Sequence, residues 1–253
     1  MGIDGRPGFN SQVLQFLKGK MESEESWKYR DCCLIIDGMK IKKMMEYDTT
    51  ISNFTGFVDL GEGFQAEGEH LATEALVFMI VGIRGHWKQA IAYFLIRSMT
   101  GTLQSQLVLH AISTLTDIGI NVRALTMDGH PTNLAMIRKL GCSTTAGRFQ
   151  TYFLGPHEEK VYCFIDACHS MKLVRNIFAS VNGVVIPHTG TAKWAHIKKL
   201  NEIQKKEGLV AANRLSDRHI HFEQQKMRVS YHLLNRYITQ LKLSPFQKFF
   251  YKK

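Results

Sequence analysis

The sequence has few of the residues that mark extended, cross-linked or membrane-spanning proteins. Five prolines in 253 residues and no internal repeat exclude a proline-rich linker, a collagen or a solenoid. Five cysteines without a C-x-x-C pair argue against a disulfide framework and against a zinc site built on thiolates. The longest apolar run, residues 75–83, is about half of what a membrane-spanning helix needs, and residues 1–20 lack a signal-peptide pattern. We therefore expect a soluble protein with no membrane partner that is not secreted.

Acidic residues are scarce in the last third of the chain. Residues 168–253 contain 16 Lys and Arg but only 4 Asp and Glu. Residues 1–167 contain 16 Lys and Arg and 18 Asp and Glu. A charge excess confined to one region indicates a polyanionic partner, with DNA the first choice. The alternatives are a solvated basic surface, or a segment whose acidic neighbour is missing.

The apolar content of 45% is ample for a core, and its periodicity predicts an α/β fold. The pattern predicts strands over 32–37, 54–60, 75–83, 89–96, 121–128 and 161–167. It predicts helices over 9–18, 102–118, 131–140 and 169–181. This order favours a mixed sheet with helices on its faces. From residue 188 onward the composition becomes basic and helical, so we expect one domain over 1–187 and a second, all-α domain over 188–253.

Two aspartates occupy matching places at the ends of predicted strands. Asp37 ends the run CCLIID and precedes a glycine, and Asp128 ends RALTMD and also precedes a glycine. Side chains at the carboxyl ends of strands converge at the functional edge of an α/β sheet. Two carboxylates held together need a cation between them, and Mg²⁺ or Mn²⁺ suits such an oxygen site. Alternatively, each aspartate only caps the turn that follows its strand.

A third group of polar residues surrounds the end of the last predicted strand. Asp166, Cys163, Cys168 and His169 could form a zinc cluster, but the spacing is loose and a packed cysteine beside a capping aspartate is the simpler interpretation. Lys172 and Arg175 lie on the following helix, from which they could reach a phosphate or a carboxylate.

One glycine-containing loop resembles a dinucleotide-binding turn. Gly61-x-Gly63-x-x-Ala66 follows a predicted strand, but three nearby glutamates would repel a pyrophosphate and the next element is predicted to be a strand. A nucleotide-binding enzyme of this kind is therefore a minor hypothesis.

Five sequence blocks, taken in this order, resemble the P-element and THAP-domain transposases. The resemblance covers residues 5–240, and the combination of blocks is specific although each block alone is weak. The blocks are DGMKIKKMMEYD (37–48), FTGFVDLGEG (54–63), LATEALVFMIVGIRGHWKQAIAYFLI (71–96), NVRALTMDGHPTNLAMIRKLG (121–141) and YCFIDACHSMKLVRN (162–176).

The resemblance implies an RNase H-like core interrupted by a mostly helical insertion that binds GTP. It implies metal-dependent DNA cleavage and strand transfer by an Asp-Asp-Glu triad, with Asp37 and Asp128 matching the two aspartates as catalytic residues and metal ligands. Residues 188–240 resemble the start of the insertion. No residue of this chain matches the catalytic glutamate, which in the family follows the whole insertion. The zinc-coordinating DNA-binding domain and the dimerising coiled coil of the family have no counterpart either.

The resemblance therefore predicts part of a nuclear DNA transposase that is catalytically incomplete, with DNA as its partner and Mg²⁺ or Mn²⁺ as its cofactor. GTP binding is in doubt, and a homo-oligomer would form through regions that are missing here. The alternative, from a different functional class, is a domesticated module that binds DNA or protein without catalysis.

Overall fold

The computed structural model describes residues 6–49, 52–64, 70–145, 147–181, 183–186, 188, 190–208 and 215–220. The chain divides into two compact units, of which the first ends at Ile165 and the second begins at Asp166. The boundary expected after residue 187 lies further along the chain, within the second unit. Among the described residues, no helix is both long enough and apolar enough to cross a membrane.

The first unit is built around a seven-stranded sheet with the order β1-β6-β5-β2-β7-β11-β10. The strands of this sheet are β1 (Gly8–Phe9), β2 (Asp31–Lys40), β5 (Glu74–Gly82), β6 (Lys88–Ile96), β7 (Asn121–Met127), β10 (Tyr152–Leu154) and β11 (Lys160–Ile165). Two small hairpins accompany it, β3 (Glu46–Asp48) with β4 (Asn53–Thr55), and β8 (Ser143–Thr145) with β9 (Arg148–Gln150). The helices of this unit are α1 (Ser11–Met21), α2 (Ser26–Tyr29), α3 (Gly101–Asp117) and α4 (Pro131–Lys139).

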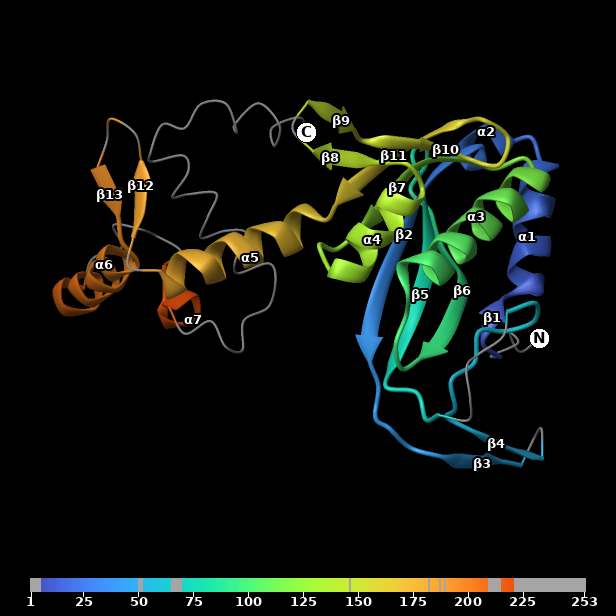
Figure 1. Cartoon of the computed structure of the whole chain (residues 1–253), viewed down its shortest axis with the longest axis horizontal. Coiled ribbons are helices and arrows are strands. Elements are labelled where there is room, and N and C mark those ends of the chain that lie inside the picture. The colour runs from blue at the N-terminus through green and yellow to red at the C-terminus, as the bar shows by residue number, and fades with distance from the viewer. Residues whose placement is uncertain are drawn as a thin grey trace. The chain divides into compact units, whose positions relative to one another are not determined.

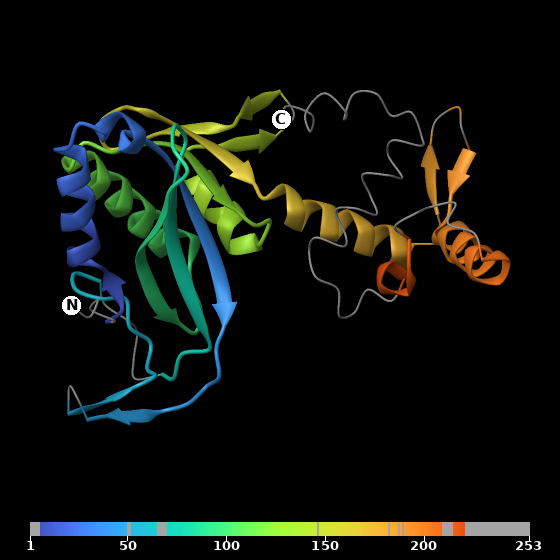
Figure 2. The same ribbon diagram turned by 180° about the vertical axis from the view of Figure 1, so that it is seen from behind.

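The sheet is mixed, as the sequence predicts. The chain runs antiparallel from β2 to β5 and from β5 to β6, and β2 and β11 both pair in parallel with β7. A crossover through α3 brings the chain from β6 back to β7, beside β2, so strands far apart in sequence become neighbours. Figures 1 and 2 show β2 and β5 side by side, with α3 on one side of the sheet.

Alternating apolar residues place the core between the sheet and its helices. Leu34 and Ile36 of β2 and Phe78 of β5 are buried together with Leu107 and Leu115 of α3. The intervening residues of β2 are only partly buried or exposed, which is the period-two pattern of a strand with one covered face. Helix α3 begins at Gly101, one residue before the predicted start, and the Thr100 side chain caps it by accepting a hydrogen bond from the backbone N–H of Leu103 at 3.1 Å.

The strand predicted over 54–60 is wrong for most of its length. Only Asn53–Thr55 forms a strand, and beyond it the chain makes isolated bridges at Phe57 and Asp59. The interruption is at Gly56, which has φ +99° and lies so close to the backbone of Met44 that a Cβ there would be 2.0 Å from the carbonyl oxygen. Only glycine fits at this position, because any side chain would overlap the Met44 carbonyl. The aromatic and β-branched residues around Gly56 predict a strand and give no sign of this backbone contact.

The second unit contains helices and one small hairpin in its described part. Its elements are α5 (Ala167–Ser180), β12 (Val184–Ile186), β13 (Gly190–Ala192), α6 (Trp194–Glu207) and α7 (Asp217–Ile220). The hairpin corrects the expectation of an all-α region from residue 188 onward, because residues 190–192 form a strand that pairs with the apolar run Val184–Ile186. Residues 209–214 and 221–253 of the expected all-α domain lie outside the described residues.

Two ion pairs to one buried aspartate lie at the amino-terminal ends of the central strands β2 and β7. Asp31 accepts a hydrogen bond from Arg123 Nε at 2.7 Å and is paired with Arg84 Nε at 2.9 Å, and its own side chain is almost fully buried. Burial acts to raise the pKa of Asp31, but the hydrogen bonds and charges of the two guanidinium groups outweigh it and hold this pKa below its ordinary value of 3.8.

We expect Asp31→Asn to lower the free energy of unfolding by about 2 kcal/mol at neutral pH, because two charge-assisted hydrogen bonds are weakened. A carboxyl whose pKa is lower in the folded state stabilises the fold above its unfolded pKa, and that stabilisation is lost as pH falls through the folded value. The difference between wild type and variant should therefore shrink below about pH 4, where denaturant titrations at several pH values would measure it. A difference that is constant from pH 7 to pH 3 would contradict this assignment.

Candidate active site

The parallel pairing of β2 with β7 brings the two predicted site aspartates to one edge of the sheet. Ile35 of β2 is in register with Thr126 of β7. Asp37 lies two residues after Ile35 and is still within β2. Asp128 lies two residues after Thr126 and directly follows β7. Asp37 lies on the sheet face of Ile35, opposite the buried face, because side chains two residues apart on a strand point to the same side. That Asp37 and Asp128 together form one site stays a prediction.

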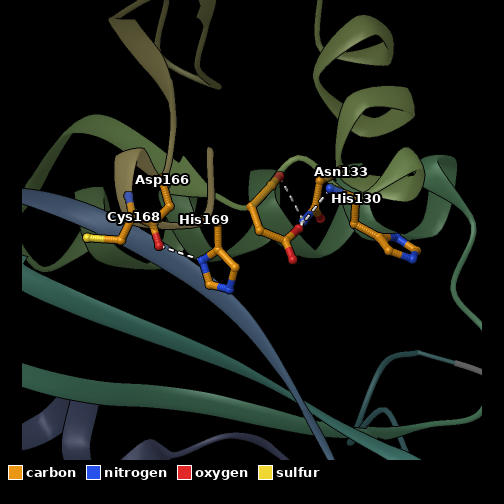
Figure 3. A network of polar contacts seen from close by, with 6 residues as sticks. His130, Asn133, Asp166, Cys168 and His169 are labelled. Carbon is orange, nitrogen blue, oxygen red and sulfur yellow. Dashed lines mark hydrogen bonds and ion pairs between the residues drawn. The ribbon is translucent and has the colours of Figure 1, made fainter. Parts of the chain in front are cut away.

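The two carboxylates have different surroundings. Asp37 is exposed and makes no side-chain hydrogen bond or ion pair to any residue that the structure describes. Asp128 is half-buried, and its Oδ1 accepts hydrogen bonds from the backbone N–H of His130 at 2.9 Å and from Nδ2 of Asn133 at 2.7 Å (Figure 3). Its Oδ2 has no hydrogen-bond partner within the described part of the chain. One oxygen of Asp128 thus performs the turn-capping role considered as the alternative, while the other stays open.

Asn133 is itself held by a residue from another helix. Its Oδ1 accepts a hydrogen bond of 2.6 Å from Nε2 of Gln104 on α3. Neither amide was singled out in the sequence. The available signal was that Gln104 lies on the apolar face of its helix, in line with Leu107, Ala111 and Leu115, where a polar side chain needs a buried partner.

In the second unit, Asp166 begins helix α5. Its Oδ1 accepts a hydrogen bond from the backbone N–H of Cys168 at 2.9 Å, and its Oδ2 lies 2.6 Å from Nδ1 of His169 (Figure 3). This is the N-cap arrangement that stabilises the first turn of a helix. Arg175 on the same helix is fully buried, and burial lowers the pKa of its guanidinium, so it is not displayed toward an outside phosphate as the sequence suggested.

The loop that resembled a dinucleotide turn has a packing role. Gly61 has φ +73°, and a Cβ on it would lie 2.5 Å from the Cα of Gly8. The next element of the described chain is strand β5, whereas a dinucleotide turn needs a helix whose N-terminus faces the pyrophosphate. The glycine is therefore explained by the close approach of two backbone segments.

The cysteines do not provide a further ligand set. Cys32 of β2 is buried in the core, and this burial raises the pKa of its thiol to about 12. Cys142 Sγ lies 3.4 Å from Cys163 Sγ in the first unit. Across residues that the structure describes, no group of three or more His, Cys, Asp or Glu side chains is placed to hold a metal ion. The oxygens of Asp37 and Asp128 fit a hard divalent cation by their chemistry, but they supply only two ligand residues.

The chain matches known proteins over both units. A family model described as the TNP-like RNase H N-terminal domain matches residues 5–141, and one described as the TNP-like GTP-binding insertion domain matches residues 168–234. The human (Homo sapiens) DNA transposase THAP9 is 33% identical over 204 residues, which are 79% of this chain and 22% of that protein. In the solved Drosophila P element transposase strand transfer complex, a chain with 20% identity matches with a TM-score of 0.70, covering 91% of this chain and 47% of that one.

The mixed sheet, the helices that flank it and these matches define an RNase H-like fold of the transposase class. More narrowly, the chain belongs to the P-element transposase family. It spans about a fifth of the length of the THAP9 relative and about half of the chain in the solved structure.

Proposed function

We propose that this chain supplies the first two acidic residues of a DDE-type DNA transposase active site. Asp37 and Asp128 are the two metal ligands. The observation that supports this role is that each stands two residues beyond the register pair Ile35 and Thr126 of two parallel neighbouring strands, with an open carboxylate oxygen. Asp37 presents an exposed carboxylate, and Asp128 presents Oδ2 while its Oδ1 is held by the protein. When Mg²⁺ or Mn²⁺ is bound at such a pair, it activates an attacking water or 3′-hydroxyl and stabilises the leaving oxygen.

Two aspartates without the third acid leave this site short of ligands. We therefore propose that residues 1–253 bind a divalent cation weakly and do not cleave DNA on their own. The protein that the family suggests works in the nucleus on DNA, and GTP is the ligand suggested for the complete insertion domain. We do not extend GTP binding to the part of that domain present here.

Titration of the purified chain with Mn²⁺, followed by electron paramagnetic resonance of the free ion, tests the metal site. We expect Asp37→Asn and Asp128→Asn each to weaken Mn²⁺ binding by at least about tenfold, because each removes a charged ligand worth at least about 1.4 kcal/mol. Asp117→Asn, which changes an exposed aspartate at the end of α3, is the matched control and should bind as wild type does. Equal affinities in all four proteins would overturn the assignment of the ligands.

Incubation of the same chain with duplex DNA and Mn²⁺ tests the proposed lack of cleavage. No nicking above background is expected. Nicking that disappears in Asp128→Ala would show that another residue replaces the third acid, and catalysis would then have to be assigned to this chain.

A binding module without catalysis is the second candidate, and the exposed lysines of α6 are the observation that favours it. Lys198, Lys199, Lys205 and Lys206 are all exposed on this helix. If binding is the whole function, Asp37→Asn and Asp128→Asn leave the DNA affinity unchanged, and the metal titration above shows no site.

A further inference from the structure

A pair of buried amides lies between helices α3 and α4, directly behind Asp128. Gln104 is 2% exposed and Asn133 is 9% exposed, and both are surrounded by the apolar core. A buried amide without partners is costly, so a hydrogen-bonded pair at this depth requires an explanation beyond packing. Leucine at either position would fill similar space in the helix interface without that cost.

The hydrogen bonds determine how the Asn133 amide is turned. Its Oδ1 accepts from Nε2 of Gln104 at 2.6 Å, so its Nδ2 faces the Asp128 carboxylate, where it lies 2.7 Å from Oδ1. Turned by 180°, the amide would place its oxygen against the carboxylate and its NH₂ against the NH₂ of Gln104. The bond from Gln104 therefore favours the orientation in which Asn133 donates to Asp128, while Oε1 of Gln104 is buried without a hydrogen-bond partner among the described residues.

The two helices approach closely at the level of this pair. Gly101 lies one turn before Gln104 on α3, and a Cβ on it would be 2.9 Å from the backbone of Ala135 and Met136 on α4. The absence of a side chain at residue 101 therefore allows α4 to pack against the turn of α3 that carries Gln104. The amide pair is held by the backbone geometry of both helices.

We infer that Asn133, oriented by Gln104, is a positioning residue that holds Oδ1 of Asp128 and leaves Oδ2 for the cation. This inference rests on the proposed function, because it takes Asp128 as a metal ligand. Asp128 follows the last residue of its strand, and among the described residues only the His130 backbone N–H would still bond its side chain without Asn133. Partners of this kind that orient a ligating carboxylate typically change metal affinity by about 10–100-fold when removed.

Mn²⁺ titration of the intact 253-residue chain provides the first test. We expect Asn133→Leu to weaken Mn²⁺ binding by about 10–100-fold, and Gln104→Leu to weaken it less, because Asn133 keeps its bond to Asp128. Ile137→Val, in the same helix interface, is the control for general loosening of the packing and should bind Mn²⁺ as wild type does. Unchanged affinity in Asn133→Leu, when Asp128→Asn has lost its affinity, overturns the positioning role alone.

A second measurement needs no metal and separates this inference from the proposed function. In ¹⁵N-edited NMR spectra, Asp128→Ala should shift the side-chain NH₂ resonances of Asn133 and speed their exchange with water, whereas Asp37→Ala should not. If the wild-type chain binds no Mn²⁺ but these resonances respond as described, the proposed metal site is refuted, whereas the hydrogen bond from Asn133 to Asp128 is supported. If the Asn133 resonances do not respond to the loss of Asp128, the positioning role is overturned whatever the metal titration shows.

Discussion

Replacing Phe78 with alanine is expected to lower the free energy of unfolding by about 3–5 kcal/mol. Phe78 lies on β5, inside the seven-stranded sheet, and is fully buried. Its ring meets Phe9 and Phe94 edge to face, with centroids 6.3 Å and 5.2 Å away. The substitution therefore opens a cavity beside Phe9 and Phe94 and removes two ring contacts.

A chemically identical change on the surface provides the control for Phe78→Ala. Phe149 on β9 is 75% exposed, and Phe149→Ala should change stability by no more than about 0.5 kcal/mol. Denaturant or thermal unfolding of both variants measures the difference. If the two variants lose equal stability, the sheet core is not where this structure places it.

Binding of duplex DNA to the exposed face of α6 should weaken steeply with added salt. Lys198 and Lys205 are seven residues apart, as are Lys199 and Lys206, so the four lysines form two rows along the helix, about 100° apart. The row of Lys199 and Lys206 lies opposite the buried residues of the helix, and the row of Lys198 and Lys205 lies at the edge of the buried face. Lys199 lies near Glu202 and Lys205 near Asp217, which reduces what these two lysines offer to a phosphate.

Three lysines of this segment, Lys193, Lys198 and Lys206, have no acidic partner among the described residues. Three phosphate contacts predict a log–log salt slope of about −2.7, so DNA affinity should fall about 40-fold between 50 and 200 mM salt. Lys198→Ala combined with Lys206→Ala should reduce the slope by about 1.8. This effect tests DNA contact and does not depend on the metal site.

Filter binding at four or five salt concentrations measures these slopes. Lys18→Ala combined with Lys139→Ala removes the same charge from exposed positions on α1 and α4 and should leave the slope unchanged. A flat salt response, or no binding at low salt, would mean that the lysines of α6 form only a solvated surface.

The sequence predicts the part of the site that depends on strand periodicity. Asp37 and Asp128 stand at the ends of apolar runs, and the α/β order of the elements favours parallel pairing of β2 with β7. The sequence therefore predicts both aspartates at the same edge of the sheet. It does not predict the hydrogen-bond partners of Asp128. Gln104 and Asn133 are 29 residues apart and meet only because Gly101 permits a close crossing of two helices, which no local pattern encodes.

The same distinction explains the errors in the fold. The run 54–60 has the composition of a strand, but the contact of Gly56 with Met44, twelve residues earlier, breaks it. The strands β8, β9 and β10 have three residues each, too few for an alternating pattern to stand out. The charge of Arg175 predicts a side chain at the surface, but the structure of the second unit shows that it is buried.

The two edges of the seven-stranded sheet bear on how the chain behaves at high concentration. Edge strands offer unpaired backbone N–H and C=O groups to which a strand of another molecule can add, the first step toward ordered aggregates. Here the edge strands β1 and β10 have two and three residues, whereas β2, with ten residues, and β5, with nine, are paired on both sides. Strand β1 pairs with β6 at Tyr93 and Ala92, and Asp59 makes an isolated bridge to Leu95 of the same strand. A neighbouring molecule therefore finds only short templates at the two edges, and β2 and β5 are closed to it.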